Sequence, residues 1–260
     1  MAIGVFDSGA GGLSVVAAIR AAMPEEEIVY FADSAFVPYG SRSDREILDR
    51  TRLCCARLLE HDVRALVIAC NTATANAIDA VRAWAPVPVI GVEPGLKPGA
   101  SATRSGVVGV LATAATLASR RYAELLRRTG EEAPEVRFVA HAAQGWVELV
   151  ESGQTDTPAA HETIRASVAP LLEAGADTLV LGCTHYPFLR SAIEAAAPGV
   201  TIIETGPAIA RELARRLRTA TSGSDHAANA AAPPARLRLE SSGDVDRLAA
   251  LAARLLPDAA

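Results

Sequence analysis

Two short stretches of this 260-residue chain resemble each other and indicate its fold: LVIACNTATA at residues 66–75 and LVLGCTHYP at residues 179–187. Each is an apolar run that stops at a cysteine and continues with small polar residues. Such a run is typical of a buried parallel strand whose carboxyl end lies at the cysteine. Ligands bind at that end of open α/β sheets. We therefore expect Cys70 and Cys183 to face one cavity from opposite sides.

The composition favours an α/β protein and excludes several classes of function. Half of the residues are hydrophobic but only 4% are aromatic, which suits helices packed on parallel strands. The formal charge of -5 indicates no attraction to nucleic acid or to anionic lipid. No apolar run is long enough to cross a membrane. The first residues lack the pattern of a signal peptide, and four cysteines suit a reducing compartment, so we expect a cytoplasmic protein.

The same composition argues against common cofactors. Lys97 is the only lysine, which argues against a Schiff base with pyridoxal phosphate. The cysteines and histidines do not have the spacing of a zinc site, so we expect no metal. Cys54 and Cys55 are adjacent and fit small core residues on a helix.

Strand and helix patterns alternate along the chain, and the alternation restarts near residue 97. We expect one α/β domain from residues 1–97 together with the returning tail 207–260, and a second from residues 98–206. Within the second domain, residues 112–128 are predicted to form a single helix. Residues 219–234 are rich in Ala, Ser, Gly and Pro and are expected to form a surface loop or a short disordered insert.

A glycine-rich turn, DSGAGG at residues 7–12, links a first strand to a first helix. Such a turn directs backbone N–H groups and a helix N-terminus toward an anion. The glycine spacing does not fit a dinucleotide, whereas a carboxylate fits a small turn of this kind. The alternative is that the glycines only make the turn and that Asp7 or Ser8 caps the helix.

A loop at residues 33–43 contains Pro38, Tyr39 and Gly40. Proline fixes its own φ and glycine permits unusual backbone angles, so the loop is expected to be ordered. It could place backbone donors and the phenol of Tyr39 over a pocket. It could equally be a simple connection between a strand and a helix.

The two cysteines suggest proton-transfer chemistry because of the residues that follow them. A single cysteine at a strand end is more often a small buried hydrophobe than a reactive group. Here Cys70 precedes Asn71 and Thr72 at the start of a helix, where the dipole favours a thiolate. A thiolate can act as a general base, and a thiol on each face of a carbon could invert its configuration without a cofactor.

Four segments, residues 3–13, 37–40, 69–75 and 181–187, resemble the glutamate racemases of bacterial cell-wall synthesis, and the similarity extends to about residue 215. The resemblance implies that Cys70 and Cys183 are the paired bases, with Asp7 and His185 as their auxiliary groups and Glu151 as a supporting carboxylate. It also implies a set of substrate contacts: Asp7, Ser8, Tyr39, Gly40, Asn71, Thr72, Thr184 and His185. Where family members often carry Cys-Pro before the Glu151 segment, this chain has AAQG at residues 142–145.

The resemblance further implies two Rossmann-like or flavodoxin-like α/β domains in a pseudo-twofold arrangement, with the active site in the cleft between them and the C-terminal tail on the first domain. The implied reaction interconverts L- and D-glutamate without a cofactor and supplies D-glutamate for peptidoglycan. Glutamate is the implied partner, nucleic acid and membrane are not, and a homodimer is compatible with a family that varies in assembly. Some members use a cell-wall nucleotide precursor as an activator.

Three alternatives compete with this reading. A related aspartate racemase or aryl-malonate decarboxylase would usually lack the histidine that follows Cys183 and Thr184. A cysteine hydrolase would use Cys183 with His185 and leave Cys70 without a task. A two-domain amino-acid-binding protein would need neither thiol.

Overall fold

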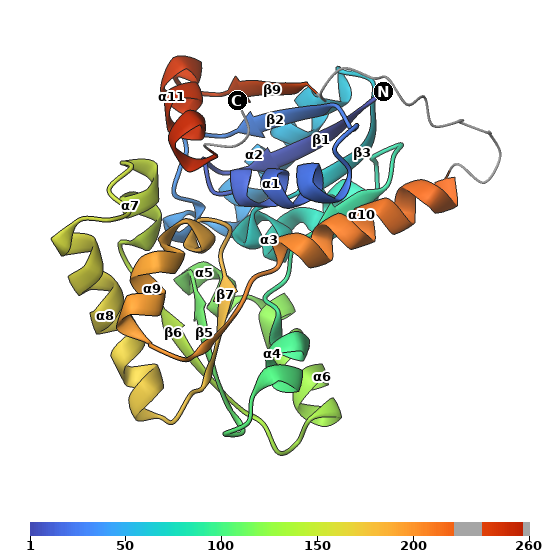
Figure 1. The fold of residues 1–260 in the computed structure, drawn as a ribbon. Coiled ribbons are helices and arrows are strands. Elements are labelled where there is room, and N and C mark those ends of the chain that lie inside the picture. Colours follow the sequence, from blue (N-terminus) through green and yellow to red (C-terminus); the bar gives the residue numbers. More distant parts are fainter. Residues whose placement is uncertain (221–235, 257–260) are drawn as a thin grey trace.

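The computed structural model describes residues 1–220 and 236–256. They form two parallel sheets, each covered by helices on both faces (Figure 1). The predicted insert at residues 219–234 lies outside this part of the chain from residue 221 onward. Within the described residues, no helix is long and apolar enough to cross a membrane. The same residues contain no group of three or more His, Cys, Asp or Glu that could hold a metal ion.

The first sheet has five parallel strands in the order β4-β3-β1-β2-β9. They are β1 (Ala2–Asp7), β2 (Ile28–Ala32), β3 (Val63–Ile68), β4 (Val89–Gly91) and β9 (Leu237–Ser241). β9 pairs with β2, with Leu237 opposite Ile28, so the C-terminal segment completes the sheet formed by the N-terminal strands.

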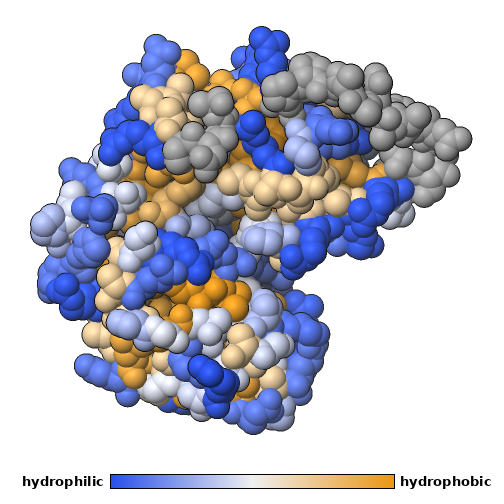
Figure 2. Space-filling model, viewed as in Figure 1, coloured by the Kyte–Doolittle hydropathy of each residue, from blue (hydrophilic) through white to orange (hydrophobic). Residues whose placement is uncertain are grey.

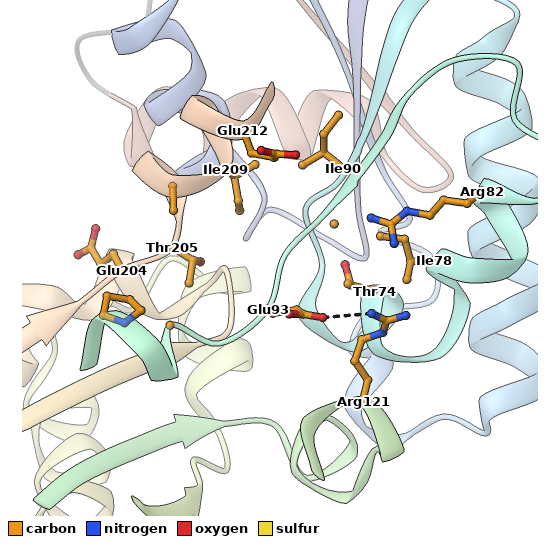
Figure 3. Close-up of a pocket in the computed structure, with 14 residues that line it drawn as sticks. Thr74, Ile78, Arg82, Ile90, Glu93, Arg121, Glu204, Thr205, Ile209 and Glu212 are labelled. Carbon is orange, nitrogen blue, oxygen red and sulfur yellow. Dashed lines mark hydrogen bonds and ion pairs between the residues drawn. The ribbon is translucent and has the colours of Figure 1, made fainter. Parts of the chain in front are cut away.

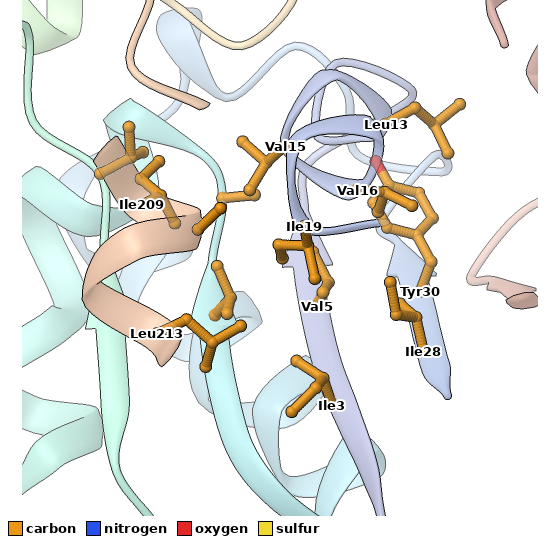
Figure 4. Packing of buried hydrophobic residues seen from close by; sticks show 14 of the residues in the cluster. Ile3, Val5, Leu13, Val15, Val16, Ile19, Ile28, Tyr30, Ile209 and Leu213 are labelled. Carbon is orange, nitrogen blue, oxygen red and sulfur yellow. The ribbon is translucent and has the colours of Figure 1, made fainter. Parts of the chain in front are cut away.

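Helices cover both faces of this sheet because its strands are apolar on both sides. One face carries α1 (Leu13–Ala22), α10 (Gly206–Ala220) and α11 (Val245–Leu255), and the other carries α2 (Asp44–Leu59) and α3 (Asn71–Arg82). Ile3 and Val5 point toward α1 and α10, where they pack with Ile19 and Leu213 (Figure 4). Phe6 points to the opposite face, as the two-residue period of a strand requires. Cys54 and Cys55 are buried there on α2, as expected.

The second sheet has four parallel strands in the order β6-β5-β7-β8. They are β5 (Val107–Ala112), β6 (Arg137–Ala142), β7 (Thr178–Gly182) and β8 (Thr201–Ile203). One face carries α7 (Trp146–Glu151), α8 (Pro158–Glu173) and α9 (Arg190–Ala196), and the other carries α4 (Leu96–Ala102) and α6 (Arg120–Glu132). Both sheets contain the relative order 2-1-3-4, which is flavodoxin-like. The predicted α/β class with two similar halves is confirmed.

The chain crosses between the two halves twice, once at residues 92–95 after β4 and once at residues 204–205 before α10. The carboxyl ends of the two sheets face each other, because contacts join the end of β1 to the end of β7 and the start of α3 to the residues after β5. The short helix α5 (Ala114–Ala118) lies between the halves (Figure 1). Hydrophilic side chains cover most of the outline of the molecule, with small apolar patches between them (Figure 2).

Two helical segments differ from the sequence-based expectation. The single helix predicted at residues 112–128 is wrong: it is two helices, α5 and α6, separated at Ser119. Thr113 and Ser119 each accept a hydrogen bond from a backbone N–H three residues on, so each starts a new helix. The helix α4 was not predicted. Pro98 lies in its first turn, where proline is tolerated, and Gly99 allows close packing on Val180.

Candidate active site

Cys70 follows β3 and is the N-cap residue of α3. Its Sγ accepts a hydrogen bond from the Ala73 N–H and lies 3.5 Å from Ser8 Oγ. Burial raises the pKa of the Cys70 thiol to about 12, and the charge of Asp7 acts in the same direction, against the hydrogen bonds from Ser8 and Ala73. The Cys70 thiol is therefore protonated at neutral pH.

Cys183 follows β7 in the other half and has a different environment. Its Sγ lies 3.7 Å from His185 Nδ1, while His185 Nε2 lies 2.6 Å from Glu151 Oε1. Burial lowers the pKa of His185, but the contacts with Cys183 and Glu151 outweigh it and hold that pKa well above its ordinary value. Burial raises the pKa of Glu151, and its contact with His185 outweighs burial and leaves the pKa lowered. A charged His185 therefore lies beside Cys183.

Asp7 ends β1 and connects the two halves. Its Oδ1 accepts from the Gly9 N–H at 2.8 Å, and its Oδ2 accepts from the Thr184 hydroxyl at 3.0 Å. Burial raises the pKa of the Asp7 carboxyl, against the effects of His185 and of these hydrogen bonds. The Ser14 hydroxyl donates to the Thr184 carbonyl at 2.8 Å, which adds a second contact between the same two segments.

The glycine-rich turn makes room for Glu151 and His185. A Cβ on Gly11 would lie 2.2 Å from His185 Nδ1, and a Cβ on Gly9 would lie 2.0 Å from Glu151 Oε1. The Ala10 N–H donates to Glu151 Oε1 at 2.7 Å. This turn was expected to bind a carboxylate, and one of its N–H groups binds a carboxylate of the protein itself.

Thr72 joins the two halves through hydroxyl groups. Its Oγ1 lies 3.0 Å from Thr113 Oγ1 and 3.3 Å from Thr116 Oγ1. Sequence reasoning missed Thr113 and Thr116. A usable signal existed, because Thr113 follows the apolar strand β5 in the way that Cys70 follows β3. The side-chain amide of Asn71 is buried and has no hydrogen-bond partner among the residues that the structure describes.

The loop with Tyr39 is ordered by a buried ion pair. The Tyr39 hydroxyl donates to Asp33 Oδ2 at 2.6 Å, and Arg50 binds the same carboxylate at 2.6 Å. The phenol is thus engaged with Asp33. Gly40 lies against Thr113, since a Cβ at Gly40 would be 3.3 Å from Thr113 Cβ. The loop therefore reaches the second half through Gly40.

Two cavities lie near these groups. One, of about 180 Å³, is lined by Pro38, Gly40 and Thr113 from the site and by Ala143, Gln144 and Glu148 from the second half. Another, of about 320 Å³, lies at the crossing between the halves and contains neither thiol (Figure 3). In that cavity Arg121 pairs with Glu93, and the same guanidinium binds Asp79 of α3. Of the predicted substrate contacts, Gly40 lines the first cavity, and that cavity too is not lined by Cys70 or Cys183.

The sequence was compared with models of known protein families. The sequence model of the Asp/Glu/Hydantoin racemase family matches residues 13–213. The chain belongs to this family. The resemblance noted from the cysteine motifs is confirmed, and so is the expectation of a racemase.

Relatives within the Asp/Glu/Hydantoin racemase family match almost the whole chain. Glutamate racemase of Ralstonia nicotianae is 51% identical and covers 99% of this chain and 90% of its own length. The solved structure of glutamate racemase isoform RacE1 from Bacillus anthracis has a TM-score of 0.84 at 33% identity, covering 98% of this chain and 94% of its own. The Escherichia coli glutamate racemase, solved with L-glutamate and the activator UDP-MurNAc-ala, has a TM-score of 0.83 at 30% identity, covering 98% and 95%.

Proposed function

We propose that this chain interconverts L- and D-glutamate by proton transfer at the α-carbon between Cys70 and Cys183, and that it supplies D-glutamate for peptidoglycan. The observation that carries the proposal is the position of the two thiols. They follow equivalent strands of the two halves, β3 and β7, and they are close enough that a charge on Cys183 would raise the pKa of Cys70. The glutamate racemases of Ralstonia nicotianae and Bacillus anthracis support the choice of glutamate.

The different surroundings of the thiols suggest the order of proton transfer. The charged His185 stabilises a Cys183 thiolate, while Cys70 holds its proton. For one enantiomer, the Cys183 thiolate removes the α-proton and becomes a thiol. The Cys70 thiol then gives its proton to the opposite face of the carbon and becomes a thiolate. The other enantiomer reacts in reverse, and a buried Cys70 thiolate is a strong base for that step.

The substrate contacts are proposed from the groups around the thiols. Backbone N–H groups at the start of α3, with Asn71 and Thr72, are placed to stabilise the charge that develops on the α-carboxylate. The unpartnered amide of Asn71 supports this, because a buried polar group without a partner is costly. The remaining proposed contacts come from both halves: Asp7, Ser8, Tyr39, Gly40, Thr184 and His185. Glu151 is proposed to act through His185.

Three broader features complete the proposal. Residues 1–97 with 207–260, and residues 98–206, act as two domains, which the pairing of β9 with β2 supports. A cytoplasmic location is supported by four free cysteines, since thiols stay reduced there. A homodimer is proposed from the family resemblance alone, and sedimentation velocity tests it.

Incubation with L-glutamate or with D-glutamate in D₂O, without pyridoxal phosphate, tests the reaction. Both optical inversion and deuterium at the α-carbon are expected, because each product receives a proton from a thiol that has exchanged with solvent. L-aspartate is the matched control and should show neither at a comparable rate. Absence of inversion with both glutamate enantiomers would overturn the proposal.

A further inference from the structure

A small cavity adjoins Glu151, the proposed partner of His185. It measures about 140 Å³ and is lined by Glu151 together with Ser34, Val37, Arg247, Leu248 and Leu251. The Glu151 side chain is 18% exposed, whereas His185 is 2% exposed. Glu151 is therefore partly accessible, and the C-terminal helix α11 forms a wall of its cavity.

The wall is one face of α11. Asp244, Arg247, Leu248 and Leu251 have the spacing of residues on the same side of a helix, and all four line the cavity. Leu248 and Leu251 are buried in the core of the first half, which holds this face in place. Asp244 caps the helix by accepting from the N–H groups of residues 246 and 247, so its carboxylate is engaged.

A second contact ties α11 to the segment that carries Glu151. Arg254 Nη2 donates to the Gly153 carbonyl at 2.7 Å, two residues beyond Glu151. A Cβ on Gly153 would lie 2.5 Å from Arg254 Nη1, so the guanidinium and the turn are closely packed. Leu255 also packs against the cores of both halves. The last helix of the first half is thereby fixed against α7 of the second.

The positive charge of Arg247 acts on the Glu151 carboxylate. Arg247 forms no ion pair within the described part of the chain, and its charge favours the ionised Glu151 carboxylate. The other titratable groups that act on Glu151 or share its cavity are Asp7, Tyr30, His185 and Asp244. Of these four groups only His185 can carry positive charge, so His185 and Arg247 are the two cations that act on the Glu151 carboxylate.

We propose that Arg247 is a positioning residue of the active site: from α11, across this cavity, it keeps the Glu151 carboxylate ionised and directed at His185. His185 in turn favours the Cys183 thiolate, so the C-terminal helix acts on the pair of thiols through Cys183 and not by a contact with Cys70. This inference rests on the proposed function, because it assigns Arg247 a role through the Cys183 base.

The test compares R247Q with R247K and with R127Q, which removes the same charge from an exposed ion pair on α6. Alkylation of each cysteine by iodoacetamide, followed by mass spectrometry from pH 5 to 9, does not require racemase activity. In R247Q we expect alkylation of Cys183 at pH 7 to be about three-fold slower, the size of effect typical of one partly exposed charge interaction, with little change at the protonated Cys70. R247K and R127Q should resemble the parent protein.

A second measurement starts from the salt dependence of the parent protein. Raising the salt concentration from 0.1 M to 1 M shortens the screening length from about 10 Å to about 3 Å. In the parent protein this should slow the alkylation of Cys183 more than that of Cys70, and the difference should disappear in R247Q. Equal Cys183 rates in R247Q and R127Q would overturn the proposal. If the parent protein does not racemise glutamate but the expected difference in Cys183 alkylation between R247Q and R127Q is observed, only the proposed function is overturned.

In racemase assays the proposal predicts an effect on kcat and pH dependence. Without the charge of Arg247 the pKa of Glu151 rises. The acidic limb of the pH–activity profile of R247Q should therefore lie at a higher pH than that of the parent protein. KM for glutamate should stay within about two-fold, because Arg247 does not line the cavity beside Gly40 and Thr113. A rise in KM with an unchanged pH profile would show a purely structural role and would contradict the proposal.

Discussion

Thr184 donates its hydroxyl to the Asp7 carboxylate at 3.0 Å, which joins the carboxyl end of β7 to the carboxyl end of β1 across 177 positions of sequence. The contact places Cys183, next to Thr184, in the same site as Ser8, which contacts Cys70. Asp7 therefore lies among the groups around both proposed bases. The closest side-chain partner is Ser8 for Cys70 and His185 for Cys183.

Replacing either proposed base should stop racemisation. For C70S and for C183S we expect kcat to fall by about 10²- to 10⁴-fold, the contribution of a positioned acid or base. Circular dichroism of the assay should detect the loss in both directions. C54S and C55S are the matched controls, because these thiols are buried on α2, are not among the proposed bases or substrate contacts, and should leave activity nearly unchanged. Full activity of either C70S or C183S would refute the two-thiol scheme.

Gly11→Ala should displace His185. The added Cβ would lie 2.2 Å from the imidazole, so we expect about 1–3 kcal/mol of destabilisation and a large loss of kcat. Gly130→Ala is the control, since nothing lies within 4 Å of a Cβ there and the residue is in α6. That change should stabilise the protein by about 0.5–1 kcal/mol. Urea denaturation measures both, and equal stability of the two variants would show that the contact with His185 is not strained.

Thr72→Val should weaken substrate binding and the contact between the halves. The change keeps the shape of the side chain and removes the hydroxyl that meets Thr113 and Thr116. We expect about 1 kcal/mol lower stability and a KM that is about five-fold higher. Thr163→Val is a suitable comparison, because that hydroxyl donates within its own helix α8. A KM for T72V equal to that of T163V would remove Thr72 from the proposed substrate site.

The ion pair of Asp33 with Arg50 should make stability depend on pH. Burial raises the pKa of the Asp33 carboxyl, but Arg50 and Tyr39 outweigh burial and leave that pKa below its ordinary value. The stabilisation is therefore present above the unfolded pKa of about 3.9 and is lost as the pH falls through the lower folded pKa. Asp33→Asn should cost about 1–3 kcal/mol at pH 7, and the difference from the parent protein should shrink below about pH 4. Thermal melts at pH 7, 5 and 3 measure it, and a constant difference would contradict this account.

Strand-end reasoning located much of the candidate site. Apolar runs followed by small polar residues pointed to Cys70 and Cys183, and the structure places both after buried parallel strands. The same reasoning applies to Asp7, which ends β1. These positions follow from local pattern, because the end of a buried strand is visible in the sequence itself.

Other parts depend on contacts between distant segments. Nothing near Glu151 in the sequence indicates that its carboxylate meets the Ala10 N–H and His185; only the family resemblance pointed to it. The helix break at Ser119 was missed because apolar periodicity does not show a capping hydroxyl. Arg247 gave no signal, because its significance comes from the way α11 returns to the first half beside a segment of the second.

The double crossing of the chain between the halves also limits how they can move. A single connection would allow one half to swivel freely on the other. The two connections, at residues 92–95 and 204–205, are neighbours, because Glu93 and Thr205 line the same cavity. Two neighbouring connections favour a hinge motion about an axis that passes through both. Such a hinge motion would change the distance between Cys70 and Cys183 while the carboxyl ends of the two sheets continue to face each other.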